Sequence, residues 1–314
     1  MTSTSWLGAP YLPLGGVNHG HEGSGVVDSG SLCPPAPCCV VLGVEAKAAA
    51  RVSLRRRDTI EDREPRDSET STSSHTGARC TNPSSSSPWT PSARGISHSH
   101  PYEYTPAVAE AKRRLSKALS QIPSDAPVTF TIKYLPYQLY PKASQEGEDK
   151  YEWYRKSRHG DSKEKMKMYT TLMSAYGVAE GIDYKFGGTV ANTLQAHRVI
   201  QHYQQTKGAE TADRIVNSLY KQYFEEERHP SSPETLLRAA TEAGVPESDA
   251  KAFIADESEE MIDVKMLIQE QAGNGIDAVP YIVVAGRKRD MTLEGCREVE
   301  AYEKALKQVI KEST

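Results

Sequence analysis

Five cysteines are the residues of this chain that could do thiol chemistry, and their spacing decides which kind is open to them. A redox pair needs one cysteine in the first turn of a helix, where the dipole lowers the thiol pKa, and a second that resolves the mixed disulfide. Cys33 and Cys38 enclose a proline-rich stretch, Cys39 follows directly, and Cys80 stands alone. No helix signal follows them, and no second spaced pair completes a zinc site. These four are predicted to be incidental, and Cys296 is interpreted as a small buried residue that opens the last helix.

The stretch 277–284, Asp-Ala-Val-Pro-Tyr-Ile-Val-Val, places a proline directly before a β-branched run. Proline is excluded from the interior of a central strand because it cannot donate a ladder hydrogen bond, but a strand can begin with it. The bond between Val279 and Pro280 can also be cis, since that form costs an X-Pro bond only about 0.5–1 kcal/mol. The local sequence leaves both the trans and the cis proline open.

Asn192 and His197 are two further polar candidates, near the start of a predicted helix. An asparagine at such a position could be a helix cap. His197 lies at the edge of an apolar stripe with Leu194 and Ile200, which suits a buried core histidine. An imidazole that reaches a pocket would instead exchange protons near neutral pH. Both interpretations of His197 stay open, and no metal site is predicted.

The elements that must position these residues follow from apolar periodicity and from cap and turn signals. Residues 107–122 carry an apolar stripe at helical spacing that ends at Pro123. Residues 128–135 alternate like a strand that stops at Pro136. Helices with no strand between them are predicted over 148–158, 162–178, 190–207, 210–228, 233–243, 247–255 and 258–272. Short strands at 282–284 and 291–293 and a helix to the C-terminus complete the order.

Composition divides the chain into residues 1–105, predicted to be a disordered low-complexity region, and residues 106–314, predicted to be one folded domain. Gly, Ser, Pro and charged residues dominate the first part. Such a segment cannot bury enough apolar surface to offset its chain entropy. Its one strand-like run, 39–44, would be marginal in isolation.

The overall composition argues against several classes of function. With 38 basic and 42 acidic residues the net charge is −4, so nucleic acid is not an expected partner. No apolar run approaches the roughly 18 residues that span a bilayer, so a membrane is not expected either. The N-terminus lacks the basic flank and apolar core of a secretory signal, which favours the cytoplasm. Disulfides in that compartment are transient rather than structural.

Five short motifs in a fixed order resemble the DsbA-like thioredoxin family over about residues 110–312. They are Lys-Arg-Arg-Leu at 112–115, Leu-Pro-Tyr-Gln-Leu-Tyr-Pro at 135–141, Asn-Thr-Leu-Gln-Ala-His-Arg at 192–198, Ile-Asp-Ala-Val-Pro at 276–280 and Leu-Glu-Gly-Cys at 293–296. The sequence looks closest to the cytosolic FrnE-like dithiol oxidoreductases, which are related to hydroxychromene-carboxylate isomerases and kappa-class glutathione transferases. The resemblance implies an α/β fold with a thioredoxin-like sheet, a large all-helical insertion at about 148–272, and a cis bond before Pro280.

The resemblance also implies roles for the candidate residues. The residue before the cis proline offers its backbone to a thiol substrate in this family, which assigns substrate binding to Val279 and a catalytic position to Pro280. Asn192 and His197 would lie near the pocket that takes the thiol or glutathione. Glutathione is implied only as a substrate, no cofactor is expected, and a homodimer is compatible with the sequence. By family topology Cys296 would lie away from the Pro280 groove.

The departure from the family lies before the first helix. Members have a core strand and then a Cys-Pro-Trp-Cys or Ser/Cys-Pro-Trp-Thr motif, whereas residues 102–111 contain no cysteine and no strand signal. The predicted sheet is therefore incomplete, lacking its first strand unless the run 39–44 fills the place. Two explanations stay open: a degenerate protein that lost its nucleophile, or a faulty gene model in which another segment replaced the true one.

Three functions follow from that gap. The leading hypothesis is a DsbA-like thiol-disulfide oxidoreductase that is impaired because its active-site motif is absent. A glutathione-dependent transferase or isomerase of the kappa type would need a hydroxyl or thiol at the start of the first helix. A non-catalytic thioredoxin-fold binding protein would need neither.

Overall fold

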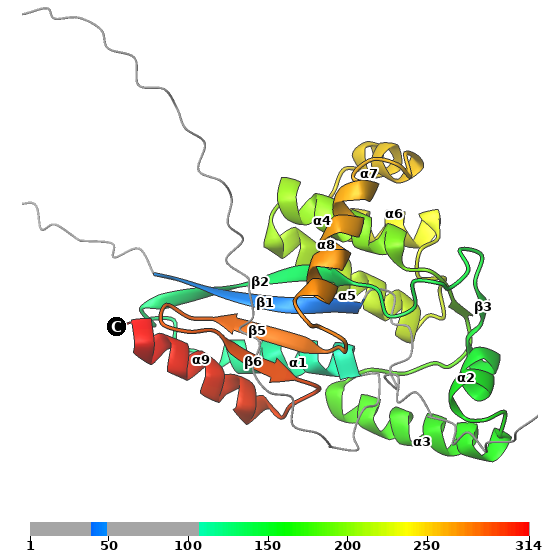
Figure 1. Ribbon diagram of the computed structural model, residues 1–314, viewed down its shortest axis with the longest axis horizontal. Coiled ribbons are helices and arrows are strands. Elements are labelled where there is room, and N and C mark those ends of the chain that lie inside the picture. The colour runs from blue at the N-terminus through cyan, green and yellow to red at the C-terminus, as the bar shows by residue number, and fades with distance from the viewer. Residues whose placement is uncertain (1–38, 49–106, 314) are drawn as a thin grey trace, which may run out of the picture. The chain divides into compact units, whose positions relative to one another are not determined.

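The computed structural model describes residues 39–48 and 107–313, and the structural statements below refer to these two ranges. Helices α1 to α9 are Ala107–Ser120, Lys150–Arg158, Lys163–Glu180, Leu194–Thr206, Ala209–Phe224, Pro233–Glu242, Glu247–Ala255, Met261–Gly273 and Val299–Ser313. Strands β1 to β6 are Cys39–Ala48, Val128–Tyr137, Glu148–Asp149, Thr189–Val190, Tyr281–Ala285 and Met291–Glu294. The predicted α/β class is confirmed (Figure 1). The insertion is mainly helical, but the expectation that it is all-helical is wrong, because β3 and β4 pair within it.

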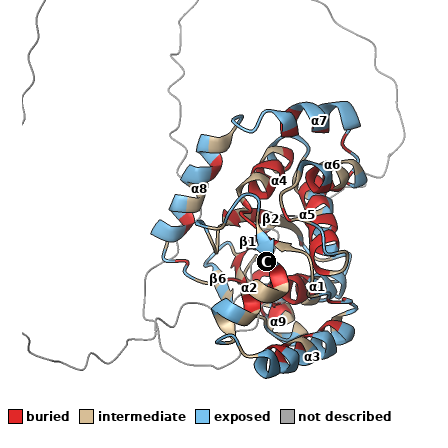
Figure 2. Cartoon of the chain, turned by 90° about the vertical axis from the view of Figure 1, so that its right-hand side faces the viewer, coloured by how far each residue is buried: buried red, intermediate tan, exposed pale blue. Residues whose placement is uncertain are grey.

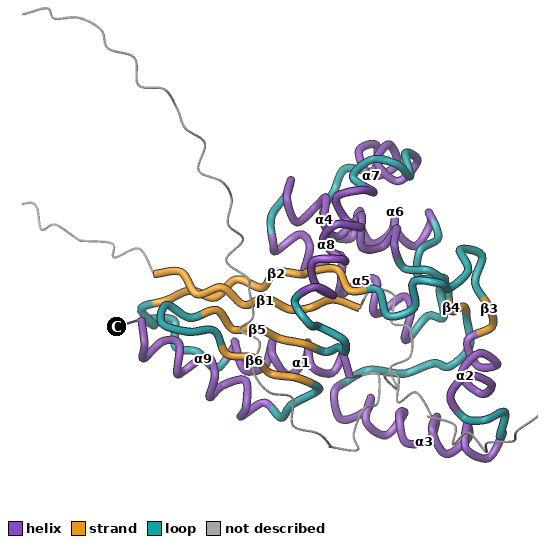
Figure 3. The backbone as a smooth tube through the Cα atoms, viewed as in Figure 1, coloured by secondary structure: helices purple, strands orange, loops and turns teal. Residues whose placement is uncertain are grey.

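β1 takes the position of the first strand that the residues directly before α1 do not supply. The strand order is β2-β1-β5-β6, with β1 antiparallel to β2 and parallel to β5 (Figure 3). Cys39 pairs with Tyr137, and Ala48 pairs with Val128 at the other end of the ladder. The expectation of an incomplete first strand is therefore wrong, because the run at 39–44 does occupy the gap.

The apolar character of β1 explains why it is stable there. Val41, Leu42 and Val44 are each 0–1% exposed. Val41 and Leu42 are adjacent and point to opposite faces, so β1 is covered on both faces of the sheet, which favours a continuous apolar run over alternation. The run is marginal in isolation but gains two hydrogen-bonded neighbours in the sheet. The remainder of the region predicted to be disordered lies outside the described residues.

Helices cover the sheet in two groups. α1 packs against α9, which contacts β5, while α4, α5 and α8 contact β2 (Figure 1). Two glutamines of α4 close the outer edge of β2: Gln204 Oε1 accepts from the Tyr134 backbone N–H at 2.8 Å, and Gln201 Nε2 donates to the Tyr134 carbonyl at 2.9 Å. These bonds occupy backbone groups that would otherwise be open to pairing with another chain.

Three details differ from the sequence predictions. β2 does not stop before Pro136 but runs through it to Tyr137. It can do so because β2 is an edge strand, where a missing N–H donor is tolerated. α4 begins at Leu194 rather than at residue 190, since β4 pairs with β3 just before it. The last helix begins at Val299, so Cys296 lies in the loop before it and does not open the helix.

A buried ion pair joins α1 to the helical insertion. Lys112 is 4% exposed, and its Nζ lies 3.0 Å from Asp213 Oδ1 of α5. It also donates to Asn217 Oδ1 at 2.6 Å. A lysine is rarely buried to this degree unless its charge is paired. The first residue of the Lys-Arg-Arg-Leu motif, Lys112, therefore has a structural role, which is to join α1 to α5.

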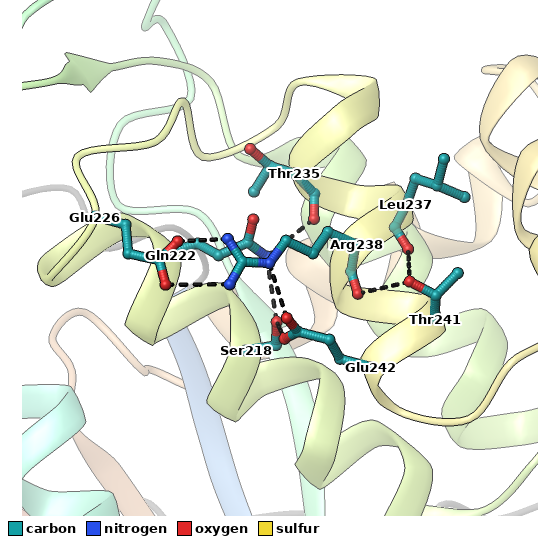
Figure 4. Close-up of polar contacts among 8 residues, drawn as sticks. All are labelled: Ser218, Gln222, Glu226, Thr235, Leu237, Arg238, Thr241 and Glu242. Carbon is teal, nitrogen blue, oxygen red and sulfur yellow. Dashed lines mark hydrogen bonds and ion pairs between the residues drawn. The ribbon is translucent and has the colours of Figure 1, made fainter.

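The α5 and α6 hairpin is held by a polar network along one side (Figure 4). Arg238 Nε donates to Glu242 Oε1 at 2.7 Å, and its Nη2 donates to Glu226 Oε1 at 3.1 Å. Gln222 Nε2 donates to the Thr235 carbonyl at 3.1 Å. These bonds complement an apolar interface, and Figure 2 shows buried residues lining the inner sides of α4 and α5.

No helix within 39–48 and 107–313 is long and apolar enough to cross a membrane.

Candidate functional site at the Pro280 end of the sheet

Pro280 directly precedes β5, and its peptide bond to Val279 is cis. The Pro280 carbonyl accepts from the Gly295 N–H at 2.9 Å, which ties the segment to the end of β6. The Tyr137 hydroxyl donates to the Asp277 carbonyl at 2.7 Å, which ties the preceding loop to the end of β2. Hydrogen bonds on both sides thus fix the position of the Pro280 segment.

α1 and β5 both begin at the same end of the sheet (Figure 1). Its first turn, Ala107–Glu110, reads Ala-Val-Ala-Glu and is buried. Thr105 and Pro106, which precede it, lie outside the described residues. The described start of α1 therefore offers no thiol or hydroxyl to the Pro280 segment, although such a helix start is where a thiol pKa would be lowered.

Asn192 acts as a structural tie between the loop after β2 and the start of α4. Its Oδ1 accepts from Gln138 Nε2 at 2.7 Å and from the Leu194 N–H at 3.0 Å. Its Nδ2 donates to the carbonyls of Pro141 and Ala143 at 3.1 and 3.3 Å. Both ends of the amide are thus engaged within the protein, and the bond to Leu194 forms a side-chain turn just before α4, whose N-cap residue is Thr193.

His197 is fully buried in α4, at 0% exposure, beside the Tyr137 backbone. Neither ring nitrogen has a hydrogen bond of good geometry within the described part of the chain. Burial lowers the pKa of His197 to about 4, against a smaller opposite effect of the Tyr137 backbone. The imidazole is therefore neutral at pH 7, and the geometry favours the core-histidine interpretation.

Cys296 lies close to the Pro280 segment, so the expectation that it would lie away from it is wrong. It follows Gly295, whose N–H bonds the Pro280 carbonyl. The side chain is half-buried and is not in a disulfide. Burial raises the pKa of Cys296 to about 12, so the thiol is protonated at neutral pH. A thiol in this state is a weak nucleophile unless a base takes its proton.

Glu110 is the site residue that sequence reasoning missed. It is 7% exposed, and the Tyr184 hydroxyl hydrogen-bonds its carboxyl group. Its Oε1 has no hydrogen-bond partner in the described ranges. The available signal was an acidic residue flanking the apolar stripe of residues 107–122. Buried charged oxygens without partners are uncommon in folded proteins and call for an explanation.

Nothing within 39–48 and 107–313 forms a group of three or more His, Cys, Asp or Glu side chains that could hold a metal ion.

Comparison with known proteins identifies the family. The family model described as the DSBA-like thioredoxin domain matches residues 109–307. A solved structure of a probable DsbA oxidoreductase from Streptomyces coelicolor is 21% identical, with a TM-score of 0.56 over 67% of this chain and 87% of that one. A putative protein disulfide isomerase from Nitrosomonas europaea is 18% identical, with a TM-score of 0.41 over 49% and 77% of the two chains. No curated protein matches. The family match covers most of the chain, which therefore belongs to the DsbA-like thioredoxin family.

Proposed function

We propose that this protein is a DsbA-like thiol-disulfide oxidoreductase that binds a thiol or disulfide substrate at the Pro280 segment but does not turn it over efficiently. Substrate would pair with the Val279 backbone, as the resemblance to thioredoxin-like folds implies. Glutathione disulfide and protein disulfides of the cytoplasm are the substrate classes that fit this branch.

The single observation that carries the proposal is the first turn of α1. It lies at the Pro280 end of the sheet but reads Ala-Val-Ala-Glu, with no nucleophile. Disulfide exchange proceeds by thiolate attack through a mixed disulfide, and turnover then needs a second thiol to resolve it. Because the described start of α1 carries no thiol opposite the substrate segment, the protein is expected to bind without catalysing.

A non-catalytic binding protein is the second candidate, and the same observation favours it. The kappa-type transferase or isomerase gains no such support, because it needs a hydroxyl or thiol that the described turn lacks.

Restoring the motif tests the proposal. Pro106 stands directly before α1, so Thr105→Cys, Ala107→Trp and Val108→Cys together create a Cys-Pro-Trp-Cys segment at the helix start. The unchanged protein should reduce insulin with dithiothreitol at the rate of the uncatalysed reaction. The triple variant should exceed that rate by at least about 10²-fold, because the helix start lowers the pKa of the first thiol.

The matched control is the variant with Ala107→Trp alone, which has the same bulk but no thiol pair and should stay at background. Every protein compared, including the one called unchanged, carries Cys296→Ser, so that the Cys296 thiol does not contribute. Strong reductase activity of the unchanged protein, or none in a folded triple variant, would overturn the proposal.

A further inference from the structure

We propose that Cys296 is a single-thiol exchange site, which forms a mixed disulfide with a low-molecular-weight disulfide, and that Glu110 accepts the thiol proton. The inference rests on the proposed function, because it takes the Pro280 segment as the place where a disulfide binds. It adds a nucleophile that the missing helix-start motif does not supply, and a reaction that stops after one exchange.

The backbone places Cys296 next to the substrate segment. Gly295 donates its N–H to the Pro280 carbonyl at 2.9 Å, and Cys296 is the next residue. The loop that carries it is held from the other side by Arg114, whose Nη1 donates to the Arg297 carbonyl at 3.2 Å. A disulfide that pairs along the Pro280 segment therefore comes near the backbone of Cys296, a half-buried residue.

The face of α1 that meets this loop carries the proposed base. Glu110 and Arg114 are one helical turn apart, so they lie on the same face. Arg114 reaches the Arg297 carbonyl and, at 3.0 Å, Glu298 Oε1. Glu110 is 7% exposed and its Oε1 has no hydrogen-bond partner among the described residues, although Tyr184 bonds the carboxyl group. The second carboxylate oxygen of Glu110 is thus left to accept a proton, and the Glu110 carboxylate interacts electrostatically with the Cys296 thiol.

The electrostatics explain why a base is needed. Burial raises the pKa of Cys296 to about 12; Arg114 opposes this, and the carboxylates of Glu110, Glu180 and Glu298 add to it. Burial also raises the pKa of Glu110, again against Arg114. A carboxylate with a raised pKa is a stronger base, and efficient proton transfer needs acid and base pKa values brought closer together. Tyr184 and Tyr302 also face this cluster, and burial raises the pKa of each hydroxyl above its usual value.

The exchange step balances without a further reagent. Glu110 takes the proton from Cys296 Sγ, and the thiolate attacks one sulfur of the disulfide. A new S–S bond forms on Cys296 as the substrate S–S bond breaks, and the departing thiolate takes the proton from Glu110. The substrate disulfide is the oxidant and Cys296 is oxidised. No resolving thiol is described nearby, so the mixed disulfide accumulates rather than turning over.

The test follows adduct formation by intact-protein mass spectrometry with oxidised glutathione as the probe. The protein used is the full chain with Cys33, Cys38, Cys39 and Cys80 replaced by serine, which leaves Cys296 as the thiol. One glutathione should add under native conditions, and Cys296→Ser should abolish the adduct. Circular dichroism confirms that each variant is folded. A folded protein that takes no glutathione would overturn the site.

The role of Glu110 is tested by whether E110Q slows or speeds adduct formation. E110Q should slow adduct formation at neutral pH by about 10²-fold, the low end of what a general base contributes. The rate of adduct formation by E110Q should then rise steadily with pH, because only the free thiolate of Cys296 reacts. Loss of a negative charge alone would have the opposite effect, since it lowers the thiol pKa and speeds the reaction.

E298Q is the matched control, because Glu298 also raises the Cys296 pKa but is 78% exposed and bonded to Arg114. It should leave the rate unchanged or slightly faster. An E110Q protein that reacts as fast as E298Q would refute the proton-acceptor role. The restored-motif assay of the proposed function is done without Cys296, so the two proposals fail independently.

Discussion

The four-stranded sheet and the helical insertion differ in how far apart in the sequence their packed elements lie. The sheet joins β1, β2 and the β5–β6 hairpin, which are far apart in the sequence. The insertion stacks α4 to α8, where consecutive helices such as α5 and α6 pack on each other. Contacts between distant segments require closing long loops, whereas neighbouring helices need little closure. The Pro280 site lies on the sheet. Its geometry therefore depends on β1, even though β1 contributes no described side chain to the site.

The largest effect is expected from breaking the sheet at its centre. Val44 is 0% exposed, and Val44→Asp would bury a carboxylate with no partner in the apolar core. Such a charge costs several kcal/mol, comparable with the whole stability of about 5–15 kcal/mol of a typical domain. The variant should therefore be unfolded, or nearly so, in urea titrations followed by circular dichroism.

Lys47→Asp is the control, since Lys47 lies on the same strand but is exposed. It should change stability by no more than about 0.5 kcal/mol. If Val44→Asp unfolds at the same urea concentration as the unchanged protein, β1 is not part of the folded domain.

The contrast also explains what could be predicted from the sequence. Helix limits depend on nearby caps and prolines, and α6 and α7 match their predicted ranges within one residue for this reason. β1 was not predicted as part of the domain, because its partners lie in distant segments and its own flanks have a low-complexity composition. The cis bond before Pro280 was expected from a motif. The proximity of Glu110 to Cys296 depends on how α1 packs against the loop before α9, which no local pattern records.

An intermediate effect is expected where the insertion meets the sheet, at His197. Burial lowers its folded-state pKa to about 4, below the ordinary value of 6.5. As the pH falls through 6.5 the unfolded chain binds a proton that the folded protein does not, so stability is lost between about pH 6.5 and pH 4. From pH 7 to pH 5 this contributes a loss of about 2 kcal/mol.

His197→Leu and His197→Gln cannot bind that proton, so both should lose less stability than the unchanged protein over the same interval. Urea titrations at pH 7 and pH 5 measure the difference. Parallel losses in all three proteins would show that the imidazole reaches solvent before unfolding, contrary to its burial.

The smallest effect is expected inside the helical insertion, at Arg238. Arg238→Ala removes bonds to Glu226 and Glu242, but the Arg238 side chain is 38% exposed and water screens the charges. The expected cost is about 1 kcal/mol, at the upper end for exposed pairs, because one guanidinium joins α6 to the segment just after α5. Lys251→Ala removes an exposed pair with Glu247 within α7 and should cost a few tenths of a kcal/mol. The gap between the two variants should narrow in high salt, which screens exposed pairs. If Arg238→Ala instead costs as much as Val44→Asp, the insertion depends on its polar network as heavily as the sheet depends on β1, and the contrast between the two regions fails.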